Sequence, residues 1–144
     1  MNVWKLGAKG LAPENFYKWS KFCLYGLALV AVVAISYGAF SGLFVAPSDY
    51  QQKDAFRIIY VHVPCAFLSL SLYLFLVVSS ICFLIWRIKI YDYLAMHLAP
   101  VGALFTFLAL ITGAIWGKPM WGTWWVWDAR LTSMLVLFFF YLGY

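Results

Sequence analysis

The chain has 144 residues, of which 66% are hydrophobic and only 10% are charged. A water-soluble protein of this size cannot bury so much nonpolar surface, because small domains leave a large share of their surface in water. The composition therefore excludes a soluble globular domain and predicts an integral membrane protein. The net charge of +5 does not indicate nucleic-acid binding, because the basic residues are spread over loops and the flanks of hydrophobic runs.

Residues 1–21 precede the first hydrophobic run and combine four lysines with aromatic side chains. We expect this basic, amphipathic lead to lie along the cytoplasmic surface of the membrane. The run that follows, residues 22–45, is too long for a cleaved signal peptide and has no obvious cleavage site. It is therefore predicted to stay in the protein as a first transmembrane helix.

Four uncharged runs carry most of the hydrophobicity, namely residues 22–45, 58–86, 94–115 and 131–144. The first three are long enough to span a bilayer, which takes about 20 apolar residues. They do not alternate polar and apolar residues, so helices are expected rather than barrel strands. The fourth is short and has no polar residues after it, so we expect a transmembrane helix of which this sequence contains only the first part. The sequence thus predicts an all-α, polytopic transmembrane bundle, with three full spans and a partial fourth, in a single membrane domain over residues 1–144.

The ten lysines and arginines predict the orientation of these helices. Four lie in residues 1–21, ahead of the first helix, whereas two lie in the loop that follows it. Cytoplasmic segments carry the excess of positive charge, and the first helix usually decides the orientation. We therefore place the N-terminus in the cytoplasm, and residues 116–130 on the periplasmic side of a bacterial inner membrane.

Three cysteines, Cys23, Cys65 and Cys82, lie in or near hydrophobic runs, and the sequence has no C-x-x-C motif. We interpret them as small buried side chains. The sequence is therefore not that of a c-type cytochrome or a thioredoxin-like protein. It also shows no nucleophile–base pair, metal-binding cluster or phosphate-binding loop, so we do not expect an enzyme.

Residues 116–130 contain five of the eight tryptophans of the chain. These are Trp116, Trp121, Trp124, Trp125 and Trp127. An aromatic belt at the membrane surface would spread such residues over all helix ends, whereas indole rings gathered in one place can stack on a flat ligand. Gly117, Pro119 and Gly122 are expected to break regular helix, and the glycines to let a ligand approach the backbone. We predict a loop, re-entrant or interfacial, that binds a flat aromatic molecule.

Charged residues and a histidine accompany the aromatic run. Lys118 and Arg130 bracket it and could pair with acidic groups of a ligand. Asp128 is expected to cap the fourth helix and could also orient Arg130. His62, in the first turns of the second helix, is either an iron ligand or an interfacial histidine with a hydrogen-bond partner. His97 is predicted at the opposite, cytoplasmic side, almost a membrane thickness from the aromatic run.

Residues 121–128, Trp-Gly-Thr-Trp-Trp-Val-Trp-Asp, resemble the W-G-x-x-W-x-W-D signature of haem-handling proteins of cytochrome c biogenesis. Residues 116–133 and 61–66 together resemble the haem exporter protein C family, CcmC. The resemblance implies six helices, with haem b bound in transit by the aromatic residues and Gly122 at the periplasmic surface. It also implies that His62 is one axial ligand of the iron and that the second lies beyond Tyr144.

The same resemblance implies partners as well as a ligand. Proteins of this kind would load haem onto a CcmE-like chaperone, next to the ABC-type subunits CcmA and CcmB and the small protein CcmD. The alternative from a different class is a permease or channel subunit. Such a protein is expected to place ionisable groups within its spans. These spans have almost none, so the sequence favours presentation of a ligand at one membrane surface.

Overall fold

A computed structural model describes the backbone of residues 13–144 and the side chains from Trp19 onward. Its elements over that range are all helical, and the extended pairing there is a single isolated bridge between Asp49 and Lys53. The prediction of an all-α protein is thus confirmed. Most of the lead predicted at residues 1–21 lies outside the described residues.

The chain forms two compact units, one up to Ser41 and one from Gly42 to Tyr144. The first unit contains helix α2, Pro13–Phe40, and the π-helical turn η1, Ser41–Val45, starts at its end. The stretch from Trp19 to Val45 is long and apolar enough to cross a membrane, and it contains the predicted first span.

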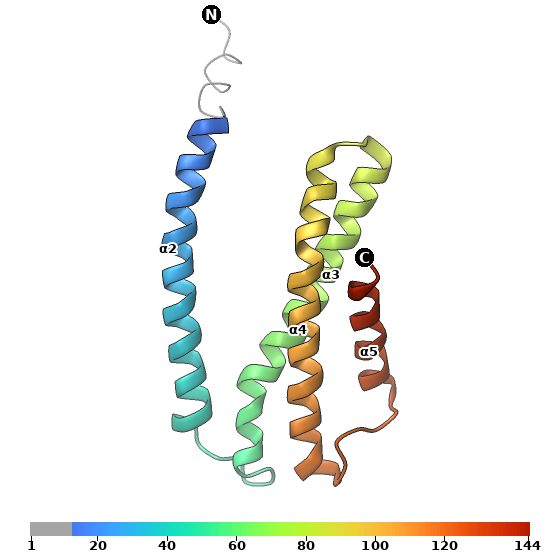
Figure 1. Cartoon of the computed structure of the whole chain (residues 1–144). Coiled ribbons are helices and arrows are strands. Elements are labelled where there is room, and N and C mark those ends of the chain that lie inside the picture. Colours follow the sequence, from blue (N-terminus) through green and yellow to red (C-terminus); the bar gives the residue numbers. More distant parts are fainter. Residues whose placement is uncertain (1–12) are drawn as a thin grey trace, which may run out of the picture. The chain divides into compact units, whose positions relative to one another are not determined.

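Two long helices and a shorter one make up most of the second unit. A 3-10 turn, η2 (Asp54–Ile58), leads into α3, Ile59–Trp86, and α4 follows at Lys89–Trp121. The two helices form a hairpin, since only two residues connect them and the first, Arg87, has a left-handed backbone with φ of 55°. The shorter helix α5, Ala129–Leu142, packs alongside α4 (Figure 1).

One face of α4 is built from small buried residues spaced three or four apart. They are Ala95, Ala99, Gly102, Thr106, Ala109, Gly113 and Gly117. This spacing keeps them on one side of the helix, where small side chains let neighbouring helices approach closely. The ring of Tyr141 in α5 lies over Gly102, and its hydroxyl donates a hydrogen bond of 2.6 Å to the carbonyl of Ser69 in α3. Tyr141 therefore ties the three helices together.

The predicted break at residue 116 is wrong. Helix α4 continues through Gly117 and Pro119 to Trp121 and ends at Gly122, which has a φ of 76°. Pro119 has no N–H to donate to the carbonyl four residues earlier, but it lies in the last turn, so the helix loses a hydrogen bond only near its end. Gly122 takes the left-handed conformation that ends many helices. The aromatic run is thus a helix end followed by a short segment, residues 122–128, without regular secondary structure.

Three helical stretches of the described residues are long and apolar enough to span a bilayer, and α5 is a shorter apolar helix. This arrangement agrees with the three full spans and the shorter fourth run expected from the sequence. The protein is a multi-pass helical membrane bundle. The division into one membrane domain over residues 1–144 stays a prediction.

Candidate functional site

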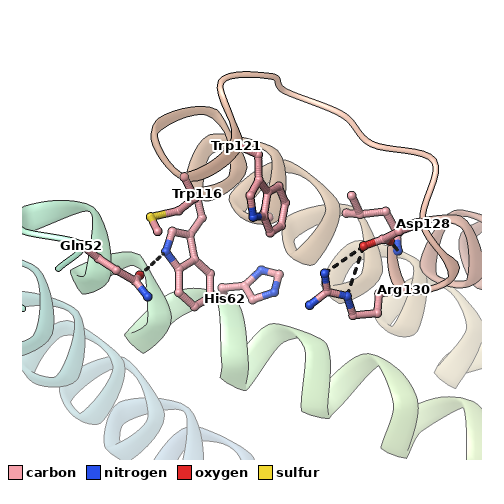
Figure 2. Close-up of a pocket in the computed structure, with 9 residues that line it drawn as sticks. Gln52, His62, Trp116, Trp121, Asp128 and Arg130 are labelled. Carbon is pink, nitrogen blue, oxygen red and sulfur yellow. Dashed lines mark hydrogen bonds and ion pairs between the residues drawn. The ribbon is translucent and has the colours of Figure 1, made fainter.

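A cavity of about 330 Å³ opens where α3 begins, α4 ends and α5 begins (Figure 2). Its lining comes from these three helices and from the loop before η2. The lining residues are Gln52, His62, Gly113, Trp116, Met120, Trp121, Asp128, Arg130 and Leu131. Five of these nine were predicted as site residues from the sequence, and they come from two segments that are more than fifty positions apart.

His62 projects from the first turns of α3 toward α4, and Figure 2 shows it between Trp116 and Arg130. Its Nδ1 lies 3.0 Å from the hydroxyl oxygen of Thr112. Its ring meets that of Trp116 edge to face, with centroids 5.7 Å apart. The imidazole is therefore fixed by contacts with α4 on one side and faces the cavity on the other.

Trp116 is held in place by a residue of the loop before η2. Its indole N–H donates a 2.9 Å hydrogen bond to the side-chain oxygen of Gln52. The backbone N–H of Gln52 in turn donates to the carboxylate of Asp49, at 2.7 Å. The turn chemistry of this loop thus sets the plane of one aromatic wall of the cavity.

Asp128, Arg130 and Trp121 form the opposite wall. Asp128 caps α5 by accepting a 2.8 Å hydrogen bond from the amide of Leu131, which confirms the predicted cap. It also forms a 2.9 Å ion pair with Arg130, whose guanidinium lies 5.8 Å from the ring centre of Trp121. The hydrogen bond from Leu131 and, after it, the one from Arg130 hold the pKa of Asp128 below its usual range.

The remaining predicted site residues do not line the cavity. Lys118 donates a 2.9 Å hydrogen bond to the carbonyl of Gly122 and lies over the ring of Trp124. Lys118 therefore stabilises the C-terminal end of α4. Trp127 is 75% exposed, and its ring contacts that of Trp125 edge to face with centroids 5.4 Å apart. The structure brings two of the five tryptophans into the cavity and leaves three beside it.

His97 lies in the first half of α4, where its Nδ1 is 2.7 Å from the carbonyl oxygen of Tyr93. Nineteen residues of one continuous helix separate it from Trp116, which is about 28 Å at the helical rise. The two histidines therefore cannot bind one iron atom within this fold. Among the described residues, no three His, Cys, Asp or Glu side chains lie together as a metal site.

Sequence reasoning missed the residues that support the site. Five such residues line the cavity or contact His62, namely Gln52, Thr112, Gly113, Met120 and Leu131. Of these five, Met120 alone lies within residues 116–130, and Thr112 and Gly113 look like ordinary positions of an apolar helix. Their one signal is the small-residue spacing of α4, which predicts a close contact but not which side chain makes it.

The cavity combines an imidazole, two indole rings and an arginine at one end of a membrane bundle. Its volume is at the lower end of the range of about 300–1,000 Å³ that is typical of ligand pockets. A flat ligand with acidic substituents would fit the indole walls and the cation, and an imidazole can bind a metal at its centre. The fold and the site define a multi-pass helical membrane protein with a pocket at one end of its second unit.

The family model described as "Heme exporter protein C" matches residues 8–144. The chain belongs to this family. It is 46% identical to "Heme exporter protein C" of Escherichia coli K12 over 141 residues, which cover 98% of this chain and 58% of that protein. It is 49% identical to the protein of that name from Paracoccus denitrificans over 148 residues, covering 100% of this chain and 58% of that protein.

A relative from the liverwort Marchantia polymorpha is also similar. It is named "Putative cytochrome c biosynthesis ccmC-like mitochondrial protein" and is 54% identical over 122 residues, covering 85% of this chain and 50% of that protein. The chain thus spans between half and three fifths of the length of these relatives. The family predicted from the aromatic signature is confirmed.

Proposed function

We propose that this chain forms part of a haem-binding site that serves the maturation of c-type cytochromes. The observation that carries the proposal is the imidazole of His62, which lines a cavity between Trp116 and Trp121. The names of the relatives, which refer to haem export and cytochrome c biosynthesis, support the same ligand. Haem b in transit is the species that we propose the cavity holds.

Each wall of the cavity has a proposed role. His62 provides a nitrogen ligand for the iron, and Trp116 and Trp121 contact the porphyrin faces or edges. Arg130 is the proposed propionate partner, because it lines the cavity, whereas Lys118 is bound to the end of α4. Haem, when bound, supplies the iron and the acidic groups that these residues recognise.

Gly122, Trp124, Trp125 and Trp127 would extend this site outside the cavity. They follow directly on Trp121, and Trp124 and Trp127 are exposed. A porphyrin is larger than a space of about 330 Å³, so part of it would lie against this segment. His97 is remote, so the second axial position would be filled by water, by a partner or by another segment of polypeptide.

We further propose that the cavity faces the periplasm of a bacterium with an inner membrane. The protein would present haem there to a CcmE-like chaperone, beside CcmA- and CcmB-like transporter subunits and a CcmD-like small protein. The role would be one of binding and positioning rather than of enzymatic catalysis. The resemblance of residues 116–133 to the family and the charge distribution support this arrangement.

A permease or channel subunit is the rival function. Such a protein would need polar groups along a path through the bilayer. Of the three buried polar residues of the described chain, Ser69, Ser79 and Thr106, the first and third donate to backbone carbonyls of their own helices, at 2.9 and 2.7 Å. The charged groups near the cavity are at one end of the bundle. This favours presentation at the surface over passage through the helices.

The test is a haem titration of the chain in detergent or nanodiscs, followed by absorption spectroscopy. We expect a Soret band typical of imidazole ligation, and its loss or shift in His62→Ala. His97→Ala is the matched control, because it removes the chain's other histidine at the remote end of α4, and its spectrum should be unchanged. An unaltered spectrum in His62→Ala would contradict the assignment of the ligand.

A further inference from the structure

The imidazole of His62 rests against one turn of α4. Its Nδ1 is 3.0 Å from the hydroxyl oxygen of Thr112. A β-carbon at position 113 would lie 3.1 Å from Cε1 of the ring, closer than most real contacts, so Gly113 provides the space that the ring occupies. Trp116 closes the same side, one turn further along the helix. The ring is therefore enclosed by three residues of one helix.

The hydroxyl of Thr112 has a single proton, and the helix backbone takes it. Its oxygen is 2.7 Å from the carbonyl oxygen of Leu108, a hydrogen bond in which only the hydroxyl can donate. The same oxygen can then serve His62 only as an acceptor. Nδ1 must carry the hydrogen, because otherwise a lone pair of the ring would face a lone pair of the hydroxyl oxygen.

This arrangement fixes the chemistry of the other ring nitrogen. A neutral imidazole with its proton on Nδ1 has a free lone pair on Nε2. Among the described residues, the enclosed side-chain nitrogens and oxygens without a partner are Nε of Arg57 and Nε1 of Trp125. Nε2 of His62 is not one of these enclosed atoms, and the ring lines the cavity. It is therefore open to the cavity.

We propose that Thr112 is a positioning residue that holds His62 in its Nδ1–H tautomer and aims Nε2 into the cavity. Histidine ligands of metals commonly donate their second nitrogen to such an outer partner, which fixes the orientation of the ring and strengthens its basicity. The consequence for haem affinity rests on the proposed function. The tautomer itself does not, because it follows from the contacts of the protein alone.

The first experiment determines the tautomer without haem, by nitrogen NMR of ¹⁵N-histidine-labelled protein in nanodiscs at a pH where the rings are neutral. His97→Gln removes the other histidine signal. We expect the Nδ1–H form of His62 in the otherwise native chain. Thr112→Val keeps the branched shape without the hydroxyl and should give a mixture of tautomers, whereas Thr112→Ser should restore the Nδ1–H form. An Nε2–H ring in the native chain, or no change in Thr112→Val, would overturn the proposal.

The second experiment is a double-mutant cycle on haem affinity. Loss of an outer partner typically weakens metal binding about 10–100-fold, and a loss in this range is expected for Thr112→Val. In the His62→Ala background the same substitution should have no further effect, because Thr112 acts through His62. A loss of equal size in both backgrounds would show that Thr112 only supports the helix, and would contradict the proposal.

Gly113→Ala provides a variant that keeps the hydroxyl. Its methyl group should push the ring away from Thr112 and also weaken haem binding, again only when His62 is present. Thr112→Val and Gly113→Ala can each be checked for intact helices by circular dichroism. A native chain that has the Nδ1–H tautomer but takes up no haem would contradict the proposed function, while the positioning of His62 by Thr112 would stand.

Discussion

Asp128 links the fourth helix to the wall of the cavity. One carboxylate oxygen accepts from the amide of Leu131, and the other pairs with Arg130. The arginine is exposed, so an ion pair with it contributes little to stability by itself. The ion pair instead orients the arginine side chain, because it holds the guanidinium near Trp121 at the rim of the cavity. One aspartate therefore sets both the start of α5 and the place of the cation.

The depressed pKa of Asp128 predicts a pH dependence. A carboxyl group whose pKa falls on folding adds stability above its usual pKa of 3.8, and this is lost as the pH falls through the lowered value. Asp128→Asn should keep the cap, since asparagine also caps helices, but lose this acid-sensitive part. Thermal unfolding followed from neutral to acidic pH will measure it. The control is Asp92→Asn, which removes a carboxylate at the opposite end of α4 from Asp128 and should keep the acid-sensitive part that depends on Asp128. Equal acid sensitivity in the native chain and in Asp128→Asn would contradict the assignment.

At the scale of the helices, the small face of α4 determines how close its neighbours lie. A β-carbon at Gly102 would overlap the ring of Tyr141, so an alanine cannot be accommodated unless that ring moves. Tyr141 is 3% exposed, and its hydroxyl reaches the backbone of α3 at Ser69. Displacement of the ring would therefore disturb the contacts of both neighbouring helices.

Gly102→Ala should destabilise the bundle by about 1–3 kcal/mol, the usual cost of overpacking a core. The matched control is Gly26→Ala in α2, where an added β-carbon meets no atom within 4 Å. That change should stabilise its helix by about 0.5–1 kcal/mol, because alanine favours a helix over glycine. Thermal unfolding in one detergent compares the two. Equal effects of the two substitutions would show that α5 does not pack on Gly102.

Local pattern predicted the helices well, because long uncharged runs in a membrane protein have few alternative structures. The local pattern also predicted the cap at Asp128, because capping involves only residues close together in the sequence. It failed at Gly117 and Pro119, which were expected to end α4. There, the ring of Trp121 packs over Gly117 and favours one more turn of helix. The pattern of glycine and proline residues does not predict this contact.

The supporting contacts of the site could not be predicted, because they join distant parts of the chain. The hydrogen bond between His62 and Thr112 spans fifty positions, and that between Gln52 and Trp116 spans sixty-four. Each depends on how far α3 is rotated against α4. The hydrogen bond of Lys118 could not be predicted either, because its acceptor, the carbonyl of Gly122, comes within reach only where the helix ends at that residue.

On the scale of the whole molecule, the two ends of the second unit differ in the number of their basic residues. The cavity end carries four basic residues, Lys53, Arg57, Lys118 and Arg130, whereas the turn between α3 and α4 has Arg87 and Lys89 close together. Three of the four at the cavity end have partners: Arg57 with Asp54, Lys118 with Gly122 and Arg130 with Asp128. These three basic side chains therefore bind groups at their own end of the helices, and their number says little about which side of the membrane that end faces. The lysines ahead of the first hydrophobic run therefore remain the best guide to orientation.

We propose on this ground that the cavity lies outside the cytoplasm, and two cysteine reporters can test the orientation. Thr123→Cys lies in the exposed segment after α4 and Lys89→Cys at the opposite end of that helix, each in a background without native cysteines. A membrane-impermeant maleimide should label position 123 in intact bacterial cells, and position 89 only after the membrane is permeabilised. The reverse pattern would place the cavity in the cytoplasm. Haem bound at His62 could then not be handed to a periplasmic chaperone, although the ligation expected at Nε2 would be unaffected.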